Sequence, residues 1–426
     1  NTFNGGLEIQ KGTVRATSAG ALGTPASGIV GVTLKAAGLD FRTDTDLTFT
    51  HSVKVVPLTT SALTSTLNLD RLTAGTGRKV TLGTLTTDGA VTLNVTSATG
   101  CSAAFSGKAY FTDTGSGATI YTAGADLALT GGVSMTSGTL TKSGPQKLTL
   151  SGTQTYGSGT TLQVNAGALA LNADAGSASK YNLALVTGGS AAVTFGASQH
   201  LARLELGGTG TATVASGGTT TVTTKNLIIS GGTSPTAKLD LNDNHLVVNY
   251  AGGADPVDTV RGYLVAGYDG STGLWTGQGI ASSAAGVIQP ATTLGYLDDP
   301  VTKTVAVKYT WLGDSNLDGV VDVDNDFSAF LDGLNGVGSG WNYGDYNYDG
   351  VVDVDNDFSM FLDGLNMQQG TLGWGGVTAL ADGIDPSALP AEQGAAGGSG
   401  FVPEPSTLVL MALGCAAMAT RRRQAA

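Results

Sequence analysis

Residues 138–159 read GTLTKSGPQKLTLSGTQTYGSG, and the chain continues as LQVNAGALAL at 162–171. Short runs of alternating apolar and polar residues are separated here by turns rich in Gly, Pro, Ser and Asn. Alternation over a few residues between turn residues predicts β-strands with one buried face. We therefore expect short strands joined by tight turns in this stretch.

The same pattern extends over most of the first 250 residues. Further runs are VTL at 80–82, AVTLNV at 90–95 and ATV at 212–214. Gly contributes 65 of 426 residues and charged residues only 13%. Helical periodicity is nearly absent there, so the expected fold class is mainly β, and this length suffices for one large β domain.

The segment 138–171 resembles the autotransporter-associated β-strand repeat, and NTFNGGLEIQKGTV at 1–14 is similar to the second half of that unit. The resemblance implies a parallel β-solenoid (β-helix), whose rungs stack on one another and whose ends need caps. Because the chain starts within a repeat, without Met or a signal peptide, we expect a truncated N-terminus.

Two acidic cassettes carry the strongest chemical signal, DSNLDGVVDVDNDF at 314–327 and DYNYDGVVDVDNDF at 345–358. Oxygen side chains stand at positions 1, 3, 5 and 9 and Gly at position 6, which suits a hard divalent cation. Between 314 and 366 the chain has twelve Asp and no Lys, Arg or Glu, so a bound cation would offset strong mutual repulsion. A solvated acidic linker is the alternative, but it needs neither the repeated DGVVD nor an apolar continuation.

Each cassette continues as FSxFLDGLN. In the first copy Phe327, Phe330, Leu331 and Leu334 stand at i, i+3, i+4 and i+7, which predicts one face of a short helix after each loop.

Residues 311–366 resemble the type I dockerin, a pair of loop–helix calcium units found on secreted bacterial polysaccharide-active proteins. The resemblance implies Ca²⁺ as the cofactor and a set of ligands for each loop. The first set is Asp314, Asn316, Asp318, the carbonyl of Val320, and Asp322; the second is Asp345, Asn347, Asp349, the carbonyl of Val351, and Asp353. Position 12, usually acidic, is Asn325 or Asn356, so a flanking Asp must supply that oxygen. Of the pairs Asp324/Asp326 and Asp355/Asp357, we expect Asp326 and Asp357, in a loop one residue longer.

The C-terminus reads VPEPST at 402–407, a mainly apolar run at 408–420, and then three Arg. The run is shorter than the roughly 20 residues of a membrane span, so a processing signal is favoured over an ordinary tail anchor. It resembles the PEP-CTERM sorting signal, which an exosortase recognises. The resemblance implies a sorting signal formed by Val402, Pro403, Glu404, Pro405, Arg421, Arg422 and Arg423. It also implies an exported protein at the cell surface or outside the cell, which contacts the membrane only through a C-terminal apolar helix before processing.

The expected organisation has five parts. These are a β-solenoid at 1–250, a spacer or cap at 251–310 with a short helix at 256–262, the dockerin-like pair at 311–366, a Gly/Ala-rich linker at 367–400, and the sorting signal at 401–426.

Signs of a catalytic centre are sparse. The four Glu and three His are scattered singly, and we expect no catalytic residues and no enzyme. The best acidic cluster is DFRTDTD at 40–46, where alternation places Asp40, Arg42, Asp44 and Asp46 on one strand face. A polysaccharide lyase or hydrolase could use such a group, whereas a solvent-facing turn with an ion pair is the plainer reading. Cys101 and Cys415 lie far apart in sequence, which predicts no disulfide framework.

Three functions remain open. The net charge of −12 and the lack of basic patches argue against nucleic acid. The leading hypothesis is a non-enzymatic structural protein of the cell surface or extracellular matrix, sorted by an exosortase. The alternatives are a scaffold subunit that binds exopolysaccharide or a cohesin-like protein, and a β-helix lyase or hydrolase.

Overall fold

The computed structural model describes residues 4–24, 31–58, 63–112, 117–287 and 291–372. They form two compact units. The first contains the described residues up to Ala215 together with Thr220–Leu239, and the second contains Ser216–Thr219 and the described residues from Asp240 onward.

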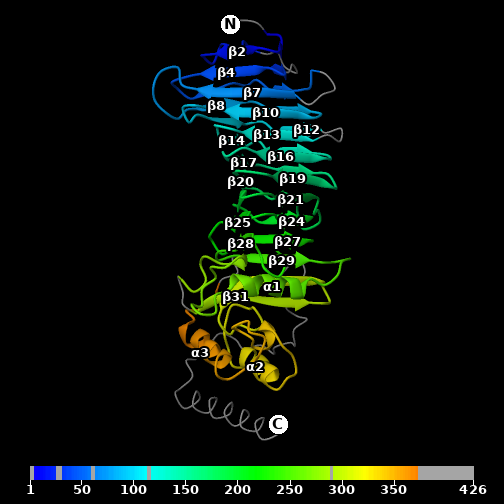
Figure 1. Ribbon diagram of the computed structural model, residues 1–426, viewed down its shortest axis with the longest axis vertical. Helices are drawn as coiled ribbons and strands as arrows, with labels where there is room; N and C mark the ends of the chain where they lie inside the picture. The colour runs from blue at the N-terminus through cyan, green and yellow to red at the C-terminus, as the bar shows by residue number, and fades with distance from the viewer. Residues whose placement is uncertain (1–3, 25–30, 59–62, 113–116, 288–290, 373–426) are drawn as a thin grey trace, which may run out of the picture. The chain divides into compact units, whose positions relative to one another are not determined.

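The first unit is a parallel β-solenoid, visible in Figure 1 as stacked strands. One ladder runs through β1 (Leu7–Gln10), β3 (Val32–Lys35), β6 (Val53–Val55), β9 (Leu85–Asp88), β12 (Ala109–Thr112), β15 (Val133–Met135) and β18 (Gln154–Tyr156). A second runs through β2 (Thr13–Ala16), β4 (Gly38–Arg42), β7 (Leu63–Asp70), β10 (Val91–Thr96), β13 (Ala118–Thr122), β16 (Thr139–Ser143), β19 (Thr160–Val164), β21 (Leu183–Thr187), β24 (Arg203–Leu206) and β27 (Leu227–Ile229). A third contains β5 (Leu47–Thr48), β8 (Lys79–Leu82), β11 (Ser102–Phe105), β14 (Leu127–Leu129), β17 (Leu148–Leu150), β20 (Ala168–Leu171), β22 (Ala192–Phe195) and β25 (Thr211–Val214).

Strand pairs in this unit join rungs rather than neighbours in sequence. For example, β16 pairs with β19, and β17 pairs with β20. Two further strands, β23 (Gln199–Leu201) and β26 (Thr221–Thr224), also pair in parallel, and β28 (Lys238–Asp240) lies at the boundary between the units. The predicted parallel solenoid is therefore confirmed, whereas membership of the autotransporter-associated repeat family stays a prediction.

The solenoid core consists of columns of apolar side chains, one from each rung. The register of the third ladder aligns the fully buried residues Phe105, Leu129, Leu150, Leu171, Phe195 and Val214. Burying one such side chain stabilises the fold by about 1.5–3 kcal/mol. Leu150, Leu171 and Val214 lie in stretches whose alternation predicted strands, and they point inward because successive side chains of a strand point to opposite faces.

One inward position holds a lysine instead of an aliphatic residue. In the second ladder Lys142 stands between Ile120 and Val164 and is fully buried. Its ammonium donates hydrogen bonds to the carbonyls of Ser143 at 3.0 Å, Gly144 at 2.8 Å and Ala166 at 2.9 Å. The chain turns after Ser143 at Gly144, whose φ of +80° favours glycine. A side chain would also not fit there, since a Cβ at Gly144 would lie 2.6 Å from the carbonyl oxygen of Thr122.

We expect Lys142→Met to destabilise the solenoid by about 1–3 kcal/mol at pH 7, because three backbone carbonyls that are at least partly buried lose their donor. Burial lowers the pKa of Lys142 from 10.5 to about 8. Between these values the unfolded chain binds a proton that the folded chain has released, so stability from this site rises with pH. Urea unfolding at pH 7 to 10 should therefore show the deficit of the variant growing above pH 8. A deficit that does not change with pH would contradict this assignment.

The second unit combines an antiparallel sheet with short helices. β29 (His245–Asn249) and β31 (Thr292–Asp299) both pair with β32 (Thr304–Trp311). The helical elements are α1 (Val257–Gly267), α2 (Asp326–Leu334), the short η1 (Trp341–Tyr343) and α3 (Asp357–Met367), and β30 (Gly279–Ala281) contacts α1. The helix expected at 256–262 is present as α1, but it runs on to Gly267.

The helices predicted after the acidic cassettes are confirmed as α2 and α3. They pack through aromatic rings, with centroids 5.5 Å apart for Phe327 and Phe361 and 5.8 Å for Phe330 and Phe358. The glycine repeated in both FLDGLN segments also has a structural role. A Cβ at Gly333 would lie 1.8 Å from the carbonyl oxygen of Tyr343, and one at Gly364 would lie 1.7 Å from that of Leu312.

Residues from both sides of the expected boundary at 310 lie in this second unit, and the finer division at 250 and 310 stays a prediction. Of the linker expected at 367–400, Met367 still belongs to α3, and residues 373–400 lie outside the described residues, as does the apolar helix expected at 408–420.

Candidate metal centre

The first acidic loop folds around the carboxylate of Asp314, which is completely buried. Its Oδ1 accepts the backbone N–H of Asp318 at 3.1 Å, and its Oδ2 accepts that of Gly319 at 2.9 Å. The hydroxyl of Thr310 also donates to Oδ2. Gly319, at φ +88°, and Leu317, at φ +59°, have the left-handed backbone that closes this turn.

Asp326 belongs to the same loop although it starts helix α2. Its Oδ1 accepts the N–H of Ser315 at 2.8 Å, and its Oδ2 accepts the N–H of Asp322 at 2.8 Å. The position-12 residue Asn325 instead turns to Asp322, whose Oδ1 accepts the Asn325 N–H at 2.7 Å. Asp326 is fully buried, and these two hydrogen bonds direct its carboxylate back across the loop that it follows.

The second loop repeats this arrangement. Asp357 accepts the N–H of Tyr346 at 2.9 Å on Oδ1 and that of Asp353 at 2.9 Å on Oδ2, while Asn356 bonds to Asp353. The equivalence of Asp326 and Asp357 supports the longer loop inferred from the sequence, although their role as ligands stays a prediction.

The remaining predicted ligands lie along each loop. Asn316 and Asp318 hydrogen-bond to each other, and so do Asn347 and Asp349. Val320 and Val351 follow the turns, and their N–H groups donate to Asp318 and Asp349, respectively, at 2.9 and 2.8 Å.

Burial sets the protonation of the central carboxyl groups. Burial raises the pKa of Asp314 to about 7. Burial, together with the nearby carboxylate of Asp314, raises the pKa of Asp326 to about 9. Burial likewise raises the pKa of Asp357 to about 7 and lowers that of Lys308 to about 7. The ammonium of Lys308 donates to the carbonyl of Leu317 at 3.3 Å.

These residues fit a calcium ion by the chemistry of their donors. Each loop offers carboxylate, amide and carbonyl oxygens, which are the ligands that Ca²⁺ takes. Crowded, buried carboxylates are costly in their charged form unless a cation compensates them. In the described ranges, no three His, Cys, Asp or Glu side chains already converge as a metal-holding group. Instead, the carboxylates of Asp314 and Asp326 accept hydrogen bonds from backbone N–H groups of the loop.

The two loops contact each other and the sheet of the second unit. The hydroxyl groups of Ser315 and Tyr346 lie 2.7 Å apart. Trp341 donates its indole N–H to the carbonyl of Asp314 at 2.7 Å, and Tyr348 donates its hydroxyl to the carbonyl of Leu294 at 2.6 Å. The sequence patterns singled out acids and helix faces, but they gave no sign that these aromatic residues brace the loops.

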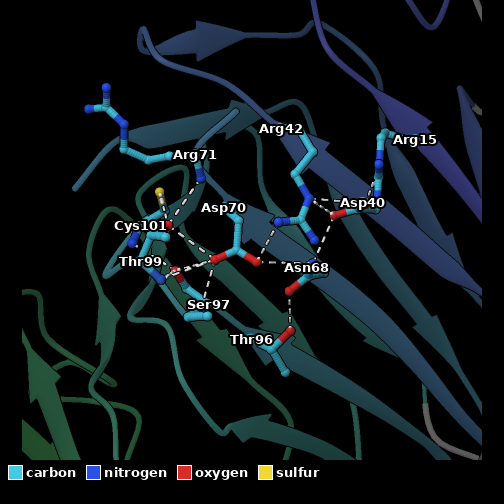
Figure 2. A network of polar contacts seen from close by, with 11 residues as sticks. Arg15, Asp40, Arg42, Asn68, Asp70, Arg71, Thr96, Ser97, Thr99 and Cys101 are labelled. Carbon is cyan, nitrogen blue, oxygen red and sulfur yellow. Dashed lines mark hydrogen bonds and ion pairs between the residues drawn. The ribbon is translucent and has the colours of Figure 1, made fainter. Parts of the chain in front are cut away.

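The acidic cluster in the solenoid is an ion-pair network rather than a group of free carboxylates. Figure 2 shows Asp40 beside Arg15, Arg42 and Asn68, with Asp40 to Arg15 at 2.6 Å and Asp40 to Arg42 at 3.0 Å. Burial raises the pKa of Asp40, but hydrogen bonds from Arg15, Asn68 and Arg42 outweigh burial and hold this pKa below its ordinary value. The adjoining Asp70 pairs with Arg42 at 3.0 Å.

The expectation that Asp40, Arg42, Asp44 and Asp46 share one strand face is wrong. Strand β4 ends at Arg42, so the alternation stops before Asp44 and Asp46. Asp44 instead bonds to Arg71 at 3.1 Å and to the backbone of Thr73, and the Thr73 N–H is the main cause of its lowered pKa. The strand ends at Arg42, so the alternation of side chains along a strand does not extend to Asp44 and Asp46.

One acid–histidine pair escaped the sequence analysis. Nδ1 of His200 lies 2.6 Å from the carboxylate of Asp174, and the ring of Tyr181 packs edge-on against His200 at 5.4 Å. Residues 174 and 200 lie on different rungs, so only stacking brings them together. Cys101 is a buried free thiol.

The sorting signal lies outside the described residues, and only its sequence can be compared. Residues 401–423 match the family model of the PEP-CTERM protein-sorting motif. No curated protein and no solved structure matches the chain. Among the described residues, no helix has the length and apolar character needed to cross a membrane. The chain thus joins a β-solenoid to a C-terminal PEP-CTERM sorting motif, which implies processing by an exosortase and export toward the cell surface.

Proposed function

We propose that this chain is a non-enzymatic structural protein of the cell surface or extracellular matrix, in which the solenoid is a stalk and the paired acidic loops are a calcium-stabilised module. The proposal rests on one observation, that the PEP-CTERM match lies C-terminal to a parallel solenoid in the sequence. A stacked solenoid is an extended body whose stability comes from contacts between neighbouring rungs, which suits a structural role.

The calcium part of the proposal rests on the loop geometry. In the first loop Asp314, Asn316, Asp318, Asp322 and Asp326 would hold the ion together with the carbonyl of Val320. In the second loop Asp345, Asn347, Asp349, Asp353 and Asp357 would do so with the carbonyl of Val351. Bound calcium would compensate the buried carboxylates and fix both loops against α2 and α3.

Sorting is tested by replacing Pro403, Glu404 and Pro405 with Ala in a host that produces an exosortase. We expect the uncleaved precursor to accumulate in the membrane fraction and the surface form to disappear, because the processing enzyme loses its recognition sequence. Immunoblots of membrane, surface and medium fractions measure this. A matched control replaces Pro386 and Pro390, which lie in the Gly/Ala-rich segment, and should be processed normally.

Normal processing of the triple variant would refute the sorting role. Degradation of a polysaccharide by the purified chain would refute the non-enzymatic role.

A further inference from the structure

The two loops differ at the carboxylate in position 1. In the first loop Oδ2 of Asp314 accepts a neutral hydroxyl, that of Thr310. In the second loop Oδ2 of Asp345 accepts the guanidinium of Arg261, with Nη2 at 3.1 Å. The sequence cassettes are nearly identical, so this difference comes entirely from the segment that packs on each loop.

Arg261 approaches the second loop from helix α1, 84 residues earlier in the chain. Asp345 is 1% exposed, whereas the Arg261 side chain is 33% exposed. A Cβ at Gly350, the position-6 glycine of this loop, would lie 3.4 Å from Nη2 of Arg261. The guanidinium therefore lies against both the first ligand position and the turn of the second loop.

A cation already bound to a ligand carboxylate opposes a second cation there. The oxygen that accepts Arg261 keeps a second lone pair, but a metal ion bound there would lie close to the guanidinium, and the two positive charges would repel each other. In the first loop the buried ammonium of Lys308 donates to the carbonyl of Leu317 and interacts electrostatically with Asp314 and Asp318. Asp314 itself accepts hydrogen bonds from neutral donors, the Thr310 hydroxyl and the N–H groups of Asp318 and Gly319.

A cleft beside Arg261 can receive its side chain when it leaves Asp345. It lines an open cleft of about 440 Å³, whose walls include Asp258 and Asp298. Asp258 stands three residues before Arg261 on α1, and side chains at this spacing are neighbours on a helix surface. A guanidinium that leaves Asp345 can thus remain solvated and paired with a carboxylate in the cleft.

We propose that Arg261 is an internal competitor of the metal at the second loop, which binds calcium only as Arg261 moves from Asp345 into the cleft. This inference rests on the proposed calcium function of the loops. It makes the contact between α1 and the second loop dependent on calcium concentration.

Calcium titration calorimetry on the intact chain tests the competition. Asp318→Asn weakens the first loop, so that the second loop can be measured by itself. In this background Arg261→Gln should tighten calcium binding by roughly tenfold or more, because a competing charge is removed. Arg261→Lys, which keeps the charge, should tighten it much less. In the Asp349→Asn background, which leaves the first loop, Arg261→Gln should change the affinity little. Lys303→Gln removes one exposed positive charge of the same unit and should leave both loops nearly unchanged.

The outcomes separate this inference from the proposed function. Calcium binding by the second loop that Arg261→Gln does not tighten would overturn the competition and leave calcium binding intact. No calcium binding by the parent or by Arg261→Gln would overturn both. Circular dichroism of each variant without calcium shows whether it is folded, and Arg261→Lys supplies the comparison if Arg261→Gln is not.

Discussion

Millimolar calcium is expected to raise the free energy of unfolding of the acidic loop pair by about 3 kcal/mol or more. An ion that binds only the folded state stabilises it by RT ln(1 + [L]/Kd), which gives about 2.7 kcal/mol per site at one hundred times Kd. The buried carboxylates of Asp314 and Asp326 are the groups that gain most, because folding without a cation buries them beside each other. Hydrogen exchange with and without a chelator measures the effect locally, over residues 311–367.

Matched variants assign this stabilisation to the loops. Asp318→Asn and Asp349→Asn each replace one predicted ligand and should each remove the part of the calcium effect that belongs to one loop. Asp332→Asn, on the α2 helix outside the loop, is the control and should retain the full effect. Equal protection of residues 311–367 in millimolar calcium and in chelator would rule out the proposed calcium module.

Trp341→Ala is expected to destabilise the second unit by about 3–5 kcal/mol, the usual cost of truncating a buried aromatic residue. Trp341 is fully buried, and its ring packs 5.2 Å from Tyr346 and 5.7 Å from Tyr348, centroid to centroid. The variant also removes the donor of the carbonyl of Asp314. Because Tyr346 and Tyr348 belong to the second loop and Asp314 to the first, both loops should lose protection together.

Denaturant unfolding followed by circular dichroism measures the loss. Val337→Ala is the control, since Val337 is 66% exposed and its truncation should change stability by less than about 0.5 kcal/mol. If Trp341→Ala unfolds at the same denaturant concentration as the parent, the loops do not depend on this aromatic packing.

The candidate site shows where sequence reasoning succeeds and where it stops. The spacing of Asp, Asn and Gly predicted the loops, and the helical spacing of Phe327, Phe330 and Leu334 predicted α2, because both patterns are local. The choice of Asp326 over Asp324 followed from its place directly before the helix, and the structure points the carboxylate of Asp326 back across the loop. By contrast, the pattern at 40–46 failed, because no local rule places the end of strand β4 at Arg42.

The sequence by itself determined the mainly β class, the acidic loops with their following helices and the sorting motif, since each depends on residues close together along the chain. The parallel solenoid was expected only from the resemblance to a repeat family. The tertiary structure alone decided which distant side chains meet. It placed Lys142 in an apolar column, paired His200 with Asp174, and brought Arg261 onto only one of two nearly identical loops. The physical reason is that alternation and loop spacing fix local geometry, whereas partners across rungs and helices depend on stacking register and on how segments far apart in the chain pack together.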